Sequence, residues 1–217
     1  LAMLICQSAV FAADGTEAET PAVSSVSESI EGYLKGFGIF YEGEAIDDTV
    51  VTRAEAADKF VRAAGCDYGM IGGETASFSD VAVGTSAWKA SEAAIILGVA
   101  TMNDEKMFYP NRTLTRIEAL TMAVRTMKAE AVASLRGGYP DGYLSIANES
   151  YLLNGISGDS AITRKDLAYI IYNMHHAQKY DITYEGDRIS YTKNPETTVA
   201  EDLLGVKKYK AEFVSTD

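Results

Sequence analysis

The chain of 217 residues lacks the features that would place it in a common enzyme class. It has no glycine-rich phosphate loop, no nucleophile elbow and no pair of carboxylates in a recognisable catalytic setting. Positive charge is also scarce: 19 Lys and Arg residues stand against 31 Asp and Glu, a formal net charge of −12. This excess of negative charge argues against nucleic acid and anionic lipid surfaces as general partners. We therefore expect no enzyme activity and no cofactor.

Cysteines and long apolar runs are scarce as well. Residues 1–13 form an apolar stretch that ends in small residues and is typical of the later part of a secretory signal peptide, cleaved near Ala12 or Ala13. It is shorter than the roughly 20 residues of a membrane helix, so we expect no membrane span in the mature chain. Cleavage removes Cys6 and leaves Cys66 alone, which excludes an intramolecular disulfide.

One short motif, Thr-Arg-x-Glu/Asp, occurs three times, at Thr52–Glu55, Thr115–Glu118 and Thr163–Asp166. A threonine followed three residues later by an acid is a capping box, in which each side chain accepts a backbone N–H of the first helical turn. Apolar residues with helical spacing follow each motif. The motif therefore predicts three helix starts.

A second helical stripe precedes each motif. The stripes end in glycine plus an aliphatic residue, the usual helix stop, at Gly38-Ile39, Gly98-Val99 and, after a weaker stripe that runs to Asn154, Gly155-Ile156. The unit is thus helix, loop, helix in three copies with loops of different length. We expect an all-α fold.

The middle copy contains an ordered series of segments: Phe78–Val81, Trp88, Ala94–Val99, Phe108–Pro110 and Leu114–Glu118. With this series it resembles the S-layer homology (SLH) module of bacterial surface proteins. The resemblance implies three tandem repeats in a pseudo-threefold bundle. The first copy matches only in its second half, and the third has Gly137–Tyr143 in place of the tryptophan region, where Tyr143 is a candidate replacement.

The expected organisation has six parts. They are the end of a signal peptide (1–13), a disordered leader (14–27), repeat 1 (28–66), repeat 2 (67–136), repeat 3 (137–177) and a β segment (178–217). Alternating residues at Asp181–Tyr184 and Arg188–Tyr191 predict a β-hairpin in the last part. With the strand-like run Lys208–Val214, this segment is expected to begin a further, truncated β-rich domain.

The resemblance implies an anionic ligand, a secondary cell-wall polysaccharide attached to peptidoglycan. Because the chain is itself acidic, binding must depend on local donors in grooves between repeats. An arginine at the first helical position is mildly disfavoured by the helix dipole, yet its planar fork suits a carboxylate. The candidate ligand-binding residues are Arg53, Arg116 and Arg164, supported by Trp88 and Asp80, with the largest contribution expected from Arg116.

Each candidate has a structural alternative. A single arginine at a helix start is commonly part of a surface ion pair. Trp88 could pack in the core, and Asp80 could cap the helix that contains Trp88 or brace a loop. His175 and His176 lie at an expected helix end, where interaction with the dipole is the ordinary explanation, so no metal site is expected.

Three functions remain open at this stage. The first is non-covalent anchoring of a secreted protein to the bacterial cell wall. The second is the anchor part of a surface hydrolase or adhesin whose active domain lies beyond Asp217. The third is a structural surface-layer protein whose repeats make protein contacts during self-assembly.

Overall fold

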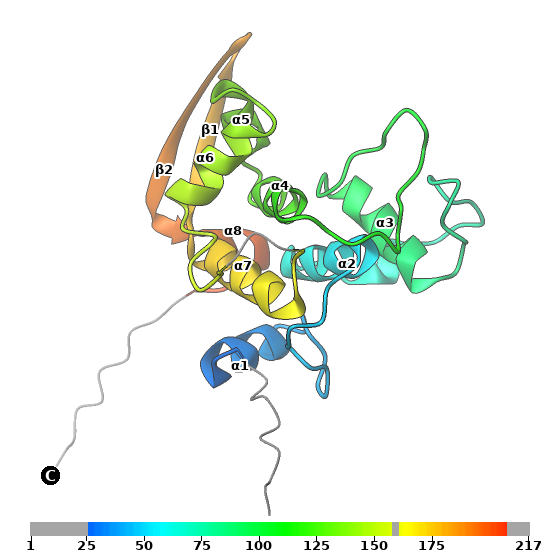
Figure 1. Cartoon of the computed structure of the whole chain (residues 1–217). Helices are drawn as coiled ribbons and strands as arrows, with labels where there is room; N and C mark the ends of the chain where they lie inside the picture. The colour runs from blue at the N-terminus through cyan, green and yellow to red at the C-terminus, as the bar shows by residue number, and fades with distance from the viewer. Residues whose placement is uncertain (1–25, 158–160, 208–217) are drawn as a thin grey trace, which may run out of the picture.

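The computed structural model describes residues 26–157 and 161–207, in which helices are the main secondary structure and are joined by one two-stranded antiparallel sheet (Figure 1). The expected signal peptide and most of the leader lie outside the described residues. Of the leader, Val26 is buried and Ser27 directly precedes the first helix.

The chain forms the following elements in order: α1 (Glu28–Gly36), α2 (Arg53–Ala63), the 3-10 turn η1 (Tyr68–Met70), α3 (Ser86–Ile96), α4 (Arg116–Thr126), α5 (Glu130–Leu135), α6 (Asp141–Glu149), α7 (Arg164–His176), β1 (Gln178–Glu185), β2 (Arg188–Thr198) and α8 (Val199–Leu204). The three motif helices are α2, α4 and α7, as the capping motifs predict. The helices that precede them are α1, α3 and α6. Two short helices, α5 and α8, were not expected.

The motif helices form the centre of the molecule. Helices α2, α4 and α7 contact one another in pairs, and each is covered by a helix from the next copy: α3 packs on α2, and α6 packs on α4. Helix α1 completes the circuit by packing on α7. In Figure 1, α1, α3 and α6 accordingly lie below, to the right of and above the motif helices.

A ring of backbone hydrogen bonds joins the three chain segments that enter the motif helices. The N–H of Val51 donates to the carbonyl of Ile162 at 2.9 Å, that of Ile162 to Leu114 at 3.2 Å, and that of Leu114 to Val51 at 3.2 Å. The three side chains are buried, so water does not satisfy these groups and the ring does. It connects segments that are 48 to 111 residues apart in sequence.

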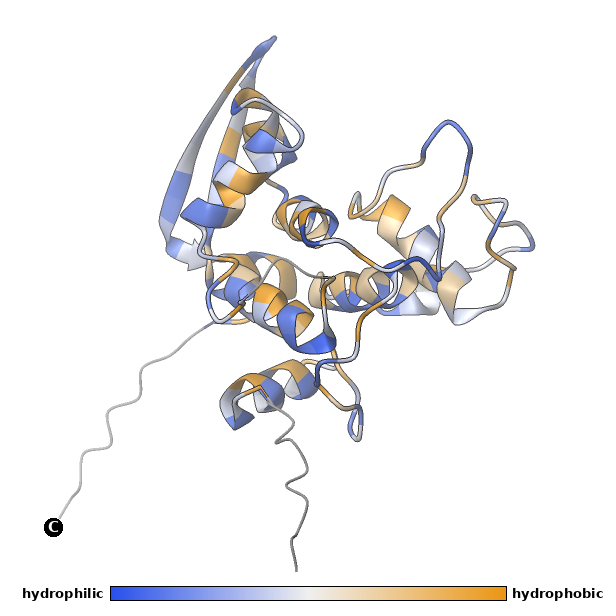
Figure 2. Cartoon of the chain, in the orientation of Figure 1, coloured by the Kyte–Doolittle hydropathy of each residue, from blue (hydrophilic) through white to orange (hydrophobic). Residues whose placement is uncertain are grey.

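The core consists of the apolar faces of these helices. In Figure 2 the helices carry orange stripes, whereas the hairpin tip is blue. All residues of the three stripes predicted behind the motifs are buried, among them Phe60, Leu120 and Leu167, which are fully inaccessible. The helical periodicity therefore identified the core faces correctly.

The first two predicted helix stops are confirmed and the third is wrong. Gly38 and Gly98 adopt left-handed backbone after α1 and α3, with φ of +66° and +71°. Helix α6 ends at Glu149, and the left-handed residue after it is Tyr151, with φ of +56°, instead of Gly155. Tertiary packing fixes this register, because the following Leu152 is fully buried. A tyrosine rarely adopts this conformation, so the pattern pointed to the later glycine.

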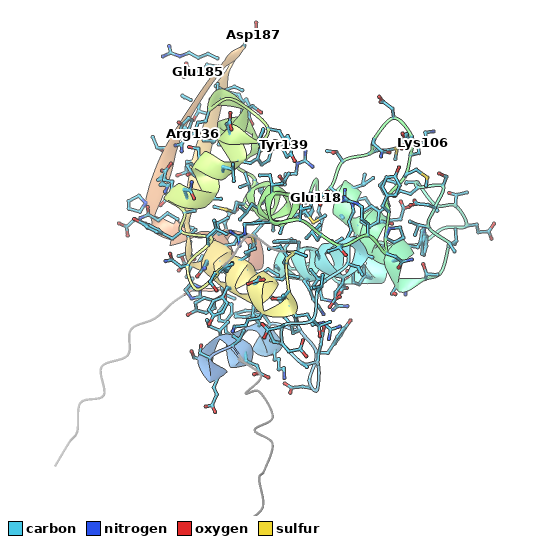
Figure 3. The ribbon with its side chains drawn as sticks, in the orientation of Figure 1. Lys106, Glu118, Arg136, Tyr139, Glu185 and Asp187 are labelled. Carbon is cyan, nitrogen blue, oxygen red and sulfur yellow. The ribbon has the colours of Figure 1, made fainter. Side chains whose placement is uncertain are left out.

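The expected hairpin is present and packs against α6. Its strands pair from Glu185 with Arg188 to Tyr180 with Lys193 and, past a register shift, at Gln178 with Thr198. Arg136, labelled beside the hairpin in Figure 3, donates through Nε to the Tyr191 hydroxyl at 3.0 Å and forms an ion pair with Glu149. Lys193 Nζ approaches the same carboxylate to 2.9 Å. The run Lys208–Val214 lies outside the described residues.

Candidate ligand-binding grooves

The motif threonines hold the arginines at the helix starts. Thr115 Oγ1 accepts the Glu118 N–H, and Glu118 accepts the Thr115 N–H at 3.0 Å, which completes a capping box. Thr163 and Asp166 form the same box at α7. The arginine after each threonine is thus the first helical residue.

The predicted box at Thr52 is only half formed. Thr52 Oγ1 accepts the Glu55 N–H at 3.2 Å, as expected. The Glu55 carboxylate, however, lies 2.6 Å from Arg164 Nε instead of capping its own helix. The expectation of three complete boxes is therefore wrong at this copy, because an ion pair between copies competes for the acid.

Two of the motif arginines reach the acid of another copy. Arg164 pairs with Glu55, and Arg53 Nη1 lies 3.7 Å from Glu118 Oε1. Arg116 is half-buried at the start of α4. The arginines therefore link copies to one another, while the side chains of Arg53 and Arg164 stay 19% and 29% exposed.

These contacts keep the groups charged. Burial raises the pKa of the Glu118 carboxyl, but hydrogen bonds from Arg112 and Thr115 outweigh burial and hold that pKa below its usual value. Burial lowers the pKa of Arg53, against the attraction of Glu118, and a guanidinium stays protonated at neutral pH even so. Glu118 thus has a second cationic partner, Arg112, independent of Arg53.

Arg164 lies in the larger of two hollows that each contain a motif arginine. We call it the α2–α3 groove. It has a volume of about 650 Å³ between α2 and the start of α3. Its charges balance: Arg62, Lys89 and Arg164 face Glu44, Glu55 and Asp58. The Arg62 guanidinium lies 4.5 Å from the ring centroid of Tyr41, which is 52% exposed.

Arg53 lies in a smaller hollow of about 230 Å³, lined by α4, by residues 99–101 after α3 and by Tyr139, which precedes α6; we call it the α4–α6 groove. Arg53 and Arg125 line this hollow with a single acid, Glu118, while Arg125 also pairs with Glu130 at 3.1 Å outside it. Tyr139, 61% exposed, forms part of the wall. Figure 3 places Glu118 and Tyr139 on the side of the molecule where α4 faces α5 and α6. A carboxylate ligand would find paired N–H donors and an exposed ring together.

The two grooves are built alike. Glu55, Asp58 and Arg62 stand at the same positions after Thr52 as Glu118, Thr121 and Arg125 stand after Thr115. Arg62 and Arg125 were not among the candidate residues. Their equal spacing from the motif threonine was the signal in the sequence that could have identified them.

Trp88 and Asp80 line neither groove. Trp88 is 4% exposed, and its indole N–H donates to the Thr75 carbonyl at 3.3 Å, as in core packing. Asp80 accepts the N–H groups of Phe108 and Tyr109 at 2.8 and 2.7 Å, so it braces the loop that leads to the second motif. Helix α3 is capped by Thr85. A ligand-binding role for Trp88 and Asp80 remains a prediction.

Tyr143 occupies the position of the missing tryptophan. It is the third residue of α6, as Trp88 is the third residue of α3. Its side chain is buried, and its hydroxyl donates to Glu130 at 2.8 Å. The replacement thus concerns packing, in which one buried aromatic residue with a polar hydrogen-bonding group substitutes for another.

His175 is part of the core and does not serve as a charged end of α7. Its Nε2 lies 2.8 Å from the Ala63 carbonyl, so Nε2 must carry the proton and Nδ1 accepts from the Tyr33 hydroxyl at 3.0 Å. Burial lowers its pKa to about 4, so the ring is neutral at pH 7 and the dipole explanation is wrong for this residue.

Within residues 26–157 and 161–207, no group of three or more His, Cys, Asp or Glu side chains is placed to hold a metal ion.

Part of the chain is similar to a known protein family, and the chain is similar to two known proteins. Residues 77–120, from the loop before α3 into α4, match the family model described as the S-layer homology domain. Over residues 77–120 the chain is thus similar to an S-layer homology domain. The match covers the copy in which the sequence resemblance is fullest.

Two curated relatives come from Brevibacillus. The "Middle cell wall protein" of Brevibacillus brevis is 26% identical over 211 residues, which cover 94% of this chain and 20% of that protein. The "Surface layer protein" of Brevibacillus choshinensis is 29% identical over 163 residues, 72% of this chain and 14% of that protein. The chain thus spans a fifth or less of the relatives it matches. With the SLH domain, these relatives indicate a secreted protein of the bacterial cell surface. In the described part of the chain, no helix is long and apolar enough to cross a membrane.

Proposed function

We propose that this SLH chain anchors a larger surface protein non-covalently by binding a secondary cell-wall polysaccharide in grooves between its copies. The SLH domain and the relatives support a cell-surface anchoring or S-layer role, and the polysaccharide is the finer step that we add. The observation that carries it is the α4–α6 groove. There Arg53 and Arg125 outnumber the one acid in a protein of net charge −12.

We further propose that the three copies are three repeats related by a pseudo-threefold axis. The ring formed by Val51, Leu114 and Ile162 supports this, since each copy donates one hydrogen bond and accepts one. The packing of α3 on α2, α6 on α4 and α1 on α7 follows the same cycle. The similar construction of the two grooves adds a third argument.

Local contacts explain how an acidic protein binds an acidic glycan. Arg53 is 3.7 Å from Glu118, beyond ordinary hydrogen-bond length, so a ligand carboxylate can take its N–H groups without breaking a short bond. Arg164 is held at 2.6 Å by Glu55, so a ligand there must compete with that acid. The groove at Arg53 is therefore the favoured site.

The test is co-sedimentation of the full chain with cell-wall sacculi, before and after acid removes the polysaccharide. We expect the protein to pellet with intact sacculi, to remain in solution with stripped sacculi, and to be released by denaturant. Equal recovery in the supernatant with both preparations would rule out anchoring through the polysaccharide.

A lattice role has one observation in its favour, since one relative is named a surface layer protein. Ordered sheets formed by the purified chain without sacculi, seen by electron microscopy, would support this second function.

A further inference from the structure

A second hollow adjoins the α4–α6 groove on the side of the hairpin. It has a volume of about 410 Å³ and is formed by the ends of α3 and α4, by α5 and by the tip of β1. Its wall includes Leu97, Arg125, Lys128, Glu130, Ser134 and Tyr184. Arg125 also lines the α4–α6 groove, so the two hollows share a wall. We call the second one the hairpin hollow.

The hairpin hollow has the chemistry of a glycan subsite. Arg125 and Lys128 line it with one acid, Glu130, which pairs with Arg125 at 3.1 Å. Because Arg125 belongs to both hollows, the pair together holds three basic groups, Arg53, Arg125 and Lys128, and two acids, Glu118 and Glu130. Tyr184 is 64% exposed and Leu97 is 37% exposed, which leaves apolar surface beside the charges. An exposed ring next to hydrogen-bond donors suits a sugar, whose faces are apolar and whose rim is polar. Figure 3 shows the end of the hairpin, at Glu185 and Asp187, beyond α5 and α6.

Lys128 stands in a backbone conformation that normally requires glycine. Its φ is +57°, directly after the C-cap residue Met127 of α4. The equivalent residue after α2 is Gly65, with φ of +76°. The ion pair of Lys128 with Asp202 is 3.5 Å long and the lysine is 68% exposed, so this pair contributes little that would justify the conformational cost. Tyr151 has the same backbone conformation, with φ of +56°, so strain alone does not assign a function; what distinguishes Lys128 is its exposed position on the wall of the hairpin hollow.

Size argues for joining the hollows. The α4–α6 groove alone, at about 230 Å³, is below the roughly 300 Å³ at which small-ligand sites begin, and the hairpin hollow brings the pair well into that range. We propose that the two form one continuous site for neighbouring units of an anionic oligosaccharide. Arg53 holds the acidic group of one unit, while Lys128 and Tyr184 contact the next. This inference rests on the proposed function and makes the hairpin part of the binding surface.

The experiment compares short and long ligands. The probe is the polysaccharide released by mild acid from Brevibacillus choshinensis sacculi, separated into single repeating units and longer fragments, with affinity measured by calorimetry on the full chain. We expect Lys128→Gly and Tyr184→Thr each to weaken binding of the longer fragments about fivefold and to leave single units unaffected, as loss of one exposed contact implies. Arg53→Ala should weaken both.

The variants are chosen so that unfolding cannot explain the result. Lys128→Gly removes the left-handed strain, so its melting temperature should stay equal or rise. Threonine keeps β propensity at Tyr184. Tyr151→Asn, which changes a tyrosine that is 69% exposed and lines neither hollow, is the matched control and should bind as the parent does.

The outcomes distinguish the proposed polysaccharide function from the proposed continuous site. If Lys128→Gly and Tyr184→Thr bind longer fragments like the parent, or lose affinity equally for single units, the continuous site is refuted while groove binding stands. If the parent binds neither fragment, the polysaccharide function fails and the continuous site fails with it.

Discussion

Among single residues, the groove arginines differ in what their removal leaves behind. Arg53 can be lost while Glu118 keeps Arg112 and the N–H of Thr115. Loss of Arg164 leaves the half-buried Glu55 without its 2.6 Å partner. Arg53→Ala therefore tests ligand binding alone, whereas Arg164→Ala changes ligand binding and the stability of the fold together.

We expect Arg53→Ala to weaken binding to sacculi by about tenfold or more, because a charge-assisted contact to an anionic sugar is lost. Its melting temperature should stay within a few degrees of the parent. Arg164→Ala should lower the melting temperature further, since an unpaired carboxylate remains in a partly buried place. Binding isotherms and melts of both variants, with Arg116→Ala alongside, also test the sequence-based expectation that Arg116 matters most. Parent-like binding by Arg53→Ala would contradict the groove assignment.

His175 predicts a loss of stability in mild acid. Its pKa is about 4 in the folded protein and about 6.5 when unfolded, so the unfolded chain takes up a proton first as the pH falls. The free energy of unfolding should therefore drop from pH 6.5 towards pH 4, by roughly 3 kcal/mol in total. Urea unfolding between pH 7 and pH 5 measures this above the range where carboxylates such as Glu118 titrate. His175→Gln should flatten the slope, and His176→Gln, at an exposed site, should leave it unchanged.

Gly142 is required by a close approach of two helices. A Cβ atom built at this residue would lie 1.9 Å from the Ala133 carbonyl oxygen, which belongs to the backbone of α5. Gly142→Ala should therefore destabilise the fold by about 3 kcal/mol or more. Gly32→Ala is the control, because nothing lies within 4 Å of that site in α1, and alanine should stabilise the helix there by about 0.5–1 kcal/mol. Opposite signs in chemical denaturation are the expected result.

Among the elements, the motif helices were predictable because their signals are local. A threonine, an acid three residues later and an apolar period fix a start and a buried face within one segment. The end of α6 was not predictable, since packing of Leu152 and a left-handed Tyr151 override the glycine signal. Helices α5 and α8 have six residues each, too few for a periodic pattern to show.

The contribution of the capping box at α4 to stability can be measured by mutation. Thr115→Ala removes the side-chain acceptor of the Glu118 N–H and should cost about 1 kcal/mol of unfolding free energy. Thr115→Ser keeps a hydroxyl and should recover most of it. Both values come from urea unfolding, and an unchanged midpoint for the alanine variant would mean that the cap contributes nothing to stability.

For the whole molecule, the sequence predicted the mostly helical class, the hairpin and the SLH resemblance, but not the grooves. A groove depends on which copies touch, and residue spacing within one copy does not reveal that Arg53 meets Glu118 or that Arg164 meets Glu55. The same limit explains Trp88: its aromatic character was read from the sequence, whereas its burial follows from α3 packing on α2. Lys128 could not be identified from the sequence, because its neighbours in the hairpin hollow come from α3, α5 and the hairpin.

The ring of backbone hydrogen bonds among Val51, Leu114 and Ile162 also has a consequence for avidity. Because it fixes the starts of α2, α4 and α7 against one another, the grooves that depend on these helices are held at constant mutual distance and orientation. Under the proposed function, binding at one groove would present the next at a high effective concentration, with no flexible linker to dilute it. Weak individual contacts to a repetitive glycan would add up to a long residence time on the wall.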